Sequence, residues 1–96
     1  MNEDLKKAYQ EKTEAKLKEW SAKLSELKGE TAGLSEEVKA NTSKNIQELQ
    51  GKIEQGKEKL TELRQQSQEN WQQTKAKLEG ISEGIKNSIN QIKSKM

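Results

Sequence analysis

The chain has 96 residues, of which 28% are hydrophobic and 35% charged, and it carries a net charge of only +2, with no Pro, Cys, His or Phe. This composition excludes an ordinary globular core, because too few large apolar side chains are present to fill one. Half of the residues are Ala, Glu, Lys, Leu or Arg, a proportion typical of long helices and coiled coils. A solitary monomer is therefore expected to be marginally stable and to need a partner surface.

The first part of the chain predicts a helix, because residues 2–28 are nearly all good helix formers. Segment 29–33 follows, with two glycines four residues apart. It is either a turn at which the chain folds back or a softened part of one long helix, because Leu34 and Val38 resume the apolar pattern in phase.

Two later segments, 39–45 and 64–70, are almost entirely polar and are candidate hinges. Between and after them, residues 46–63 and 71–96 carry the strongest apolar patterns, with apolar residues at intervals of three and four. Such spacing stacks side chains on one side of a helix, so both stretches predict amphipathic helices.

On a helix that turns about 100° per residue, the apolar residues of all these stretches fall in one sector, roughly 140° wide. We therefore predict a single all-α domain over residues 1–96: a long amphipathic helix, either continuous or bent into two or three antiparallel segments of a coiled coil or helical bundle. Of the six glycines, only Gly56 interrupts the apolar sector. The predicted interaction surface, called the apolar face below, consists of Leu17, Trp20, Leu24, Leu27, Leu49, Ile53, Leu60, Leu63, Trp71, Leu78, Ile81, Ile85, Ile89 and Ile92.

Threonine and serine also lie near the centre of the apolar sector, which suits a wet or reversible contact better than a dry core. These residues are Thr13, Thr31, Thr42, Ser67 and Thr74. Part of the pattern repeats every eleven residues, which corresponds to three turns of an almost straight helix rather than to the seven-residue repeat of a left-handed coiled coil. The repeat runs through Leu27, Val38, Leu49, Leu60 and Trp71.

Charge is sorted by sign around the same helix. Nearly all acidic residues lie on the side away from the apolar face, and basic residues flank the face along both edges. One edge holds Lys12, Lys16, Lys23, Lys52, Lys59, Lys77 and Lys95, and the other holds Lys28, Lys39, Lys57, Arg64, Lys75, Lys86 and Lys93. Lys6, Lys7, Lys18 and Lys44 lie outside these edges. The C-terminal part of the edges, called the basic border below, consists of Lys75, Lys77, Lys86, Lys93 and Lys95.

An apolar face, basic edges and an acidic back are typical of helices that lie on lipid, where lysine stems reach along the apolar surface and the ammonium groups meet phosphates. The alternative is a coiled coil whose charges only keep it in solution. Lysine on both edges would place like charges together across the seam of a two-helix coil, which disfavours a tight homodimer but leaves a loose bundle open.

Nothing in the sequence indicates catalysis. Without His or Cys there is no usual nucleophile–base pair and no soft metal site, and the glycines form no phosphate-binding loop. Lysines alternate with glutamates, so no basic run suited to nucleic acid builds up. We therefore expect no enzyme activity, no cofactor, no metal and no nucleic-acid partner. The acidic start and the lack of a long apolar run lead us to expect a cytoplasmic protein, either free or peripherally bound to a membrane.

Three stretches resemble a bacterial family of small, charged coiled-coil proteins associated with stress response. They are AKLKEWSAKLSELK (15–28), NIQELQGKIEQGKEKLTELR (45–64) and SQENWQQTKAKLEGISEGIKNSI (67–89), in which the "KEW" and "ENW" positions are the most distinctive. Members of the family carry more Asp, Ala and Trp near the end, where this chain has isoleucines. The resemblance implies an all-helical cytoplasmic protein connected with stress and supplies no catalytic residues. In general character the chain also looks like late-embryogenesis-abundant proteins and exchangeable apolipoproteins.

Two functional hypotheses follow. In the first, the protein acts under stress, and its amphipathic helix coats anionic membranes or partly unfolded client proteins. In the second, it is a structural coiled-coil or helical-bundle module that self-associates as a homo-oligomer.

Overall fold

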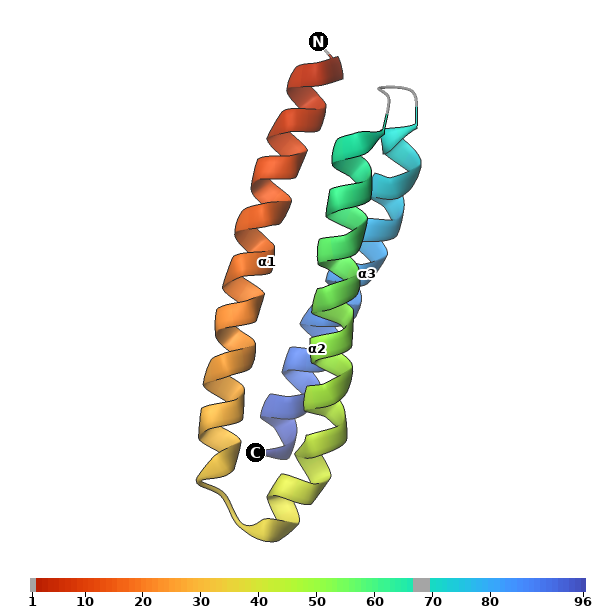
Figure 1. Ribbon diagram of the computed structural model, residues 1–96. Coiled ribbons are helices and arrows are strands. Elements are labelled where there is room, and N and C mark those ends of the chain that lie inside the picture. Colours follow the sequence, from red (N-terminus) through yellow and green to blue (C-terminus); the bar gives the residue numbers. More distant parts are fainter. Residues whose placement is uncertain (1, 67–69) are drawn as a thin grey trace.

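The computed structural model describes residues 2–66 and 70–96, which form three helices and no strand (Figure 1). The helices are α1 (Asn2–Ala32), α2 (Glu36–Gln65) and α3 (Trp71–Lys95). Each helix is antiparallel to the next, so α1 and α3 run in the same direction and the two termini lie at opposite ends of the bundle. The bundle measures 52 × 18 × 17 Å. The prediction of an all-α chain is confirmed, and of the two alternatives the structure has the one that is bent into three antiparallel segments.

The chain folds back after α1, which ends inside segment 29–33. There the Gly33 N–H donates to the Glu30 carbonyl oxygen at 3.3 Å, and the Leu34 N–H donates to the Thr31 carbonyl oxygen at 3.1 Å. Bonds of this short span tighten the last turn of a helix and satisfy carbonyl groups that have no partner further along the chain. The chain therefore turns here instead of continuing as one long helix.

Ser35 begins α2 from an extended backbone conformation, and its side-chain oxygen accepts a hydrogen bond from the Val38 N–H at 3.4 Å. A serine in this position satisfies one of the four N–H groups that the first turn of a helix leaves unpaired. Glu36 and Glu37 add negative charge at the positive end of the helix dipole. The residues that follow the turn thus favour a new helix start.

The two candidate hinges lie in different surroundings. Segment 39–45 is inside α2, where Thr42 is fully buried and its hydroxyl donates to the Val38 carbonyl oxygen at 2.9 Å. Because this bond satisfies the hydroxyl locally, the helix passes through the polar segment without a break. Segment 64–70 contains the end of α2 and the start of α3, and its residues 67–69 lie outside the described residues.

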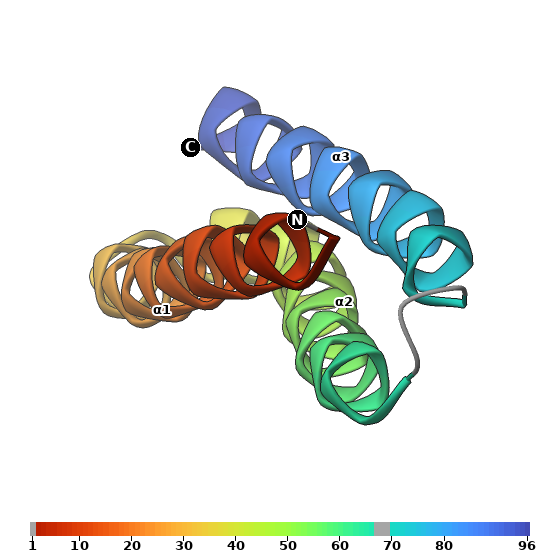
Figure 2. The same ribbon diagram turned by 90° about the horizontal axis from the view of Figure 1, so that it is seen from above.

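α2 is the central helix. It packs along both α1 and α3, whereas α1 and α3 contact each other at few places. Seen from above, the three helices form a three-cornered arrangement and are inclined to one another (Figure 2). The main core cluster consists of Leu17, Trp20, Leu24, Leu27, Ile46, Leu49, Ile53, Leu60, Ile85, Ile89 and Ile92. A smaller cluster of Leu63, Trp71 and Leu78, against which Tyr9 packs, lies nearer the other end.

The three helices approach one another closely at Gly56. A Cβ atom placed on it would lie 2.8 Å from Leu17 Cδ2 of α1 and 3.6 Å from Ile81 Cγ2 of α3. Because Gly56 has no side chain, Leu17 of α1 and Ile81 of α3 can both pack against α2 at this level. Gly51, by contrast, faces open space, with no atom within 4 Å of the corresponding Cβ position.

These two glycines predict opposite effects on stability. Gly56→Leu should lower the free energy of unfolding by about 1–3 kcal/mol, because overpacking the core outweighs the gain in helix propensity. Gly51→Ala should raise it by up to about 1 kcal/mol, since only the propensity changes. Urea denaturation followed by circular dichroism measures both values. A Gly56→Leu protein as stable as the Gly51→Ala protein would contradict the close approach of the three helices.

Candidate functional site

The predicted apolar face is brought together, but it faces the inside of the chain. Thirteen of its fourteen residues are at most 8% exposed, and Ile81 is partly buried and packs against the main cluster. The large hydrophobic residues that remain exposed in the described part of the chain are Leu5 and Met96, which lie near opposite ends. In this closed bundle the face is covered without a second copy of the chain. A partner could reach it only if helices separated.

The basic border lies on α3, and most of it is exposed. Lys77, Lys86, Lys93 and Lys95 are exposed, whereas Lys75 is half-buried. The Lys75 ammonium lies 5.4 Å from the ring centroid of Tyr9 and 5.7 Å from that of Trp71, close enough for a cation–π interaction with each. Four of the five lysines therefore remain available to an outside anion, and Lys75 helps to hold α1 against α3.

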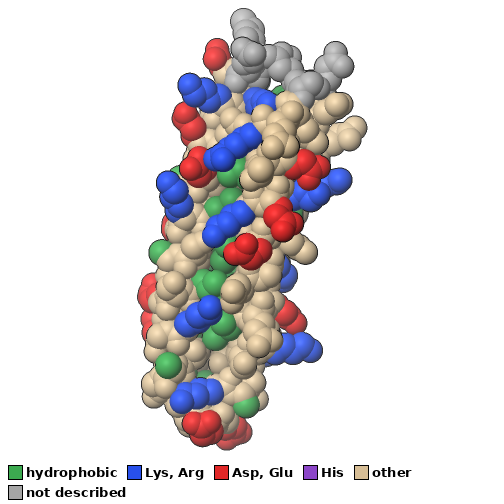
Figure 3. Space-filling view, in the orientation of Figure 1, with side chains coloured by type: hydrophobic (Ala, Val, Ile, Leu, Met, Phe, Trp, Pro, Cys, Tyr) green, Lys and Arg blue, Asp and Glu red, His purple; other side chains and the backbone are tan. Residues whose placement is uncertain are grey.

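Basic residues line the seams between the helices throughout the bundle. Each of four grooves along these seams is lined by more basic than acidic side chains. In the orientation of Figure 3, hydrophobic side chains show as a narrow line with Lys or Arg side chains beside them. The edges predicted from the sequence thus meet at the seams, where lysine stems cover the rim of the buried apolar face.

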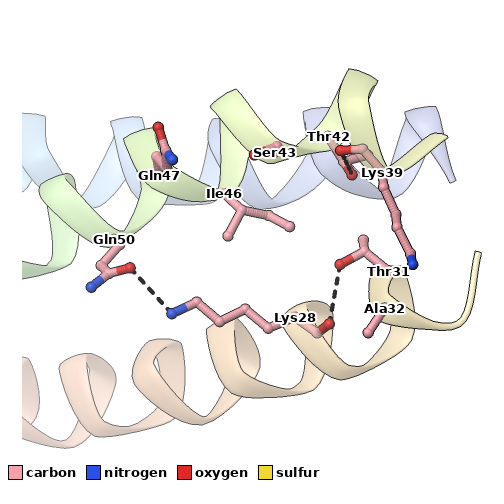
Figure 4. Close-up of a pocket in the computed structure, with 9 residues that line it drawn as sticks. All are labelled: Lys28, Thr31, Ala32, Lys39, Thr42, Ser43, Ile46, Gln47 and Gln50. Carbon is pink, nitrogen blue, oxygen red and sulfur yellow. Dashed lines mark hydrogen bonds between the residues drawn. The ribbon is translucent and has the colours of Figure 1, made fainter. Parts of the chain in front are cut away.

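The groove between the end of α1 and the start of α2 illustrates this arrangement (Figure 4). Lys28 comes from α1 and Lys39 from α2, while Ile46 lies between the helices. The Lys28 ammonium donates to the Gln50 side-chain oxygen at 3.2 Å, and none of the residues that line this groove is acidic. The groove thus presents two cations above an apolar floor.

The α1–α3 seam has the smallest contact of the three. Its groove is lined by Lys12 and Lys16 from α1 and by Lys86 from α3, with Glu79 and Glu83 as the acidic residues. The charges of this groove are more nearly balanced than those of the other three grooves. Charge repulsion therefore does not account for the small contact between α1 and α3.

A cluster at one end of the bundle holds the start of α1. The Lys6 ammonium donates to the main-chain carbonyl oxygens of Arg64 at 3.3 Å and of Gln66 at 2.6 Å. Arg64 in turn pairs with Glu14 of α1, with 2.7 Å between its Nη2 and the carboxylate Oε2. Cations at these carbonyls are favoured, because the C-terminal end of α2 carries negative dipole charge. We call Lys6, Tyr9, Glu14 and their partners on α2 and α3 the N-terminal clasp.

The clasp was not predicted from the sequence. The only signal was that Lys6 falls outside the basic edges, which does not identify its partner sixty residues away. Aromatic packing completes the clasp: the ring centroids of Tyr9 and Trp71 lie 6.1 Å apart, and the Tyr9 hydroxyl donates to the Lys75 carbonyl oxygen at 3.4 Å. The clasp and the close approach at Gly56 are thus two points at which α1 and α3 are linked.

The surroundings of Tyr9 shift the pKa of its phenol. Burial raises the pKa of Tyr9 above its ordinary value of 10.0, a hydrogen bond with Thr13 lowers this pKa, and the negative charge of Glu79 raises it. Within residues 2–66 and 70–96, no group of acidic side chains gathers that could hold a metal ion. The same residues contain no helix that is both long and apolar enough to cross a bilayer.

Comparisons with family models, with curated proteins and with solved structures give no match to this chain. Its function is therefore argued from the arrangement of its own residues.

The raised pKa of Tyr9 predicts a loss of stability in alkali. The folded state holds the phenol proton more tightly than the unfolded state, so the stabilisation is fully present below the unfolded pKa and is lost as pH rises through the folded pKa. Between about pH 9 and pH 11 the wild-type protein should lose more stability than Tyr9→Phe, which has no proton to lose. The two proteins are otherwise identical in sequence. Equal losses in urea denaturation would show that the phenol is not buried against α3.

Proposed function

We propose that this protein is a non-enzymatic surface-binding protein whose bundle opens on anionic membranes and lays its apolar face on the lipid. The observation that carries the proposal is the position of the basic residues: they line the seams that cover the apolar face, and the acidic residues lie mostly away from it. A role in stress, implied by the sequence resemblance, is part of this proposal. The same opened face would also suit partly unfolded client proteins.

α1 is the helix that we expect to move. It contacts α3 at few places, and its contact with α2 is smaller than the contact between α2 and α3. The turn at residues 33–35 links it to α2, so α1 can swing away while α2 and α3 stay paired. This motion would expose Leu49, Ile53 and Ile85, which are almost completely buried in the closed bundle.

Opening should cost little, because the core is thin and contains polar groups. Thr13, Thr31 and Thr74 are buried at positions where a tighter core would hold apolar residues. Among residues 2–66 and 70–96, the buried side-chain nitrogen of Trp71 and the buried hydroxyl of Ser21 find no hydrogen-bond partner, and each such group costs about 1–3 kcal/mol. An open form could satisfy both groups with water or lipid headgroups.

On an anionic surface the lysines would supply the driving force along with the apolar residues. Their stems can follow the apolar face while the ammonium groups reach the lipid phosphates. Each lysine near the surface contributes about 1 kcal/mol. The C-terminal helix combines the exposed lysines of the basic border with Ile85, Ile89 and Ile92, so α3 should make the first contact.

A second candidate function is that of a structural helical bundle that self-associates. The nearly complete burial of the apolar face within one chain favours a stable bundle, and copies would then associate through the exposed polar surface. In that case the lysines of the seams would stabilise the closed form and contacts between copies. Sedimentation over a range of protein concentrations would reveal such an assembly.

The basic border predicts salt-sensitive binding to anionic vesicles. Replacing Lys86, Lys93 and Lys95 with Gln should weaken binding about 100-fold, because three contributions of about 1 kcal/mol are lost and 1.4 kcal/mol corresponds to tenfold. Binding of the wild-type protein should also fall as added salt screens the lysines. Co-sedimentation with vesicles that contain phosphatidylserine measures both effects.

A control carries a change in net charge at other positions. Lys7 and Lys44 are exposed, lie outside the basic edges and line none of the four grooves, so their replacement with Gln should weaken vesicle binding much less than replacement of Lys93 and Lys95. If both double variants lost the same affinity, binding would depend only on net charge. Wild-type protein that ignores the vesicles would remove the membrane proposal.

Energy transfer between two labels tests whether α1 moves. The natural chain has no cysteine, so Ala8→Cys with Gln73→Cys places dyes only at exposed positions on α1 and α3 beside the clasp. Transfer should be efficient in water and should fall when anionic vesicles are added. A control pair on α2 and α3, Gln65→Cys with Gln73→Cys, should not change. Unchanged transfer in the first pair on vesicles that bind the protein would mean that the closed bundle binds.

A further inference from the structure

The groove between the middle of α2 and the middle of α3 combines cations with an apolar floor. Its volume is about 620 Å³, within the range of small-molecule sites. Lys52 and Lys59 line it from α2, and Lys77 lines it from α3. Ile81 provides its apolar side chain, packed on one side against the main core cluster. The groove lies at the most extensive helix contact of the bundle, so it persists whether or not α1 moves.

Two glycines of α3 keep this groove open. A Cβ atom on Gly80 would have no atom within 4 Å, and one on Gly84 would meet only the Lys52 side chain, at 3.7 Å from its Cδ. Each glycine disfavours a helix by about 1 kcal/mol relative to alanine, and nothing in the packing forbids a side chain at either position. The room that they leave is therefore space beside the lysines that a bound chain of CH₂ groups could fill.

The charges lining the groove favour an anion. Three lysines face one acidic residue, Glu58. The Lys52 ammonium donates one hydrogen bond, at 2.8 Å, to the neutral Ser88 hydroxyl, which leaves further N–H donors free because an ammonium has three. The Lys59 ammonium lies 3.1 Å from the Glu62 carboxylate, a surface pair that an incoming anion can replace at small cost.

We propose that this groove binds a single-chain anionic amphiphile, an alkyl chain that ends in a phosphate or carboxylate group. The head group lies between Lys59 and Lys77, and the alkyl chain lies over Gly80 and Ile81 and reaches the Lys52 side chain beside Gly84. The lysine stems add apolar surface along the rim. Binding takes place in the closed bundle, and so it does not depend on the proposed opening on membranes. It adds a soluble ligand to the proposed membrane partner.

Isothermal titration with decyl phosphate, below the concentration at which it forms micelles, tests the site. The wild-type protein should bind one molecule per chain, whereas Gly80→Leu/Gly84→Leu should bind at least about tenfold more weakly because leucine fills the groove. Gly29→Leu/Gly51→Leu is the matched control, because both of these glycines are exposed and face open space. Both double variants should keep the helicity of the wild-type protein, since leucine favours a helix over glycine.

Charge gives a second test that does not depend on filling the groove. Lys77→Glu should also weaken decyl phosphate binding at least about tenfold, while Lys44→Glu, an exposed change on α2 away from the groove, should leave it nearly unchanged. Decyltrimethylammonium, which carries the same chain with a cationic head, should not bind. Equal binding of the two amphiphiles would overturn the proposal, as would decyl phosphate binding that survives in both groove variants.

The outcome is separable from that of the membrane proposal. Wild-type protein that binds vesicles but not decyl phosphate would remove the groove site alone. Protein that binds decyl phosphate but not vesicles would remove the membrane proposal and leave the groove site standing. A second copy of the chain in the groove would appear as concentration-dependent assembly that Gly80→Leu/Gly84→Leu abolishes, and it would overturn the amphiphile proposal if decyl phosphate did not compete.

Discussion

α2 packs against two neighbouring helices with the same narrow apolar sector. Leu49, Ile53 and Leu60 belong to the core cluster that joins α2 to residues of both α1 and α3. Gly56 removes a side chain at the level where Leu17 and Ile81 approach it from either side. The shared sector explains why α1 and α3 barely touch: each helix turns its apolar residues toward α2, and the polar edges are left to face one another.

Most of the core could be predicted because the Leu, Ile, Val, Trp and Tyr residues of the sequence fit one helical frame, although Leu5 fits it as well and is exposed. Trp20, Leu49 and Ile85, assigned to one face from spacing alone, are all buried in the same cluster. The folding back of the chain could not be predicted from that frame. Leu34 and Val38 resume in phase on the far side of the turn at 33–35, so a straight helix and a folded bundle leave the same periodic signal. The decisive details are local ones, above all the Ser35 cap.

Contacts between side chains that are far apart in the sequence could not be predicted from it. The link between Lys6 and the end of α2 joins residues that share no pattern. The pairing of Arg64 with Glu14 likewise requires the first and second helices to be set side by side at a particular height. The lysine edges show the same limit: their positions around each helix were predictable, but their meeting at the seams follows only once the helices are packed.

The central place of α2 also bears on how the chain reaches this structure. Each of the two main helix contacts joins neighbours in the sequence, so most of the native contacts are local. Helical domains with local contacts fold in microseconds to milliseconds, because little loop entropy has to be lost before contacts form. The α2–α3 hairpin has the larger contact and should form the folding nucleus, with α1 docking afterwards. The helix that would join last in folding is then the one with the smaller contacts in the finished bundle.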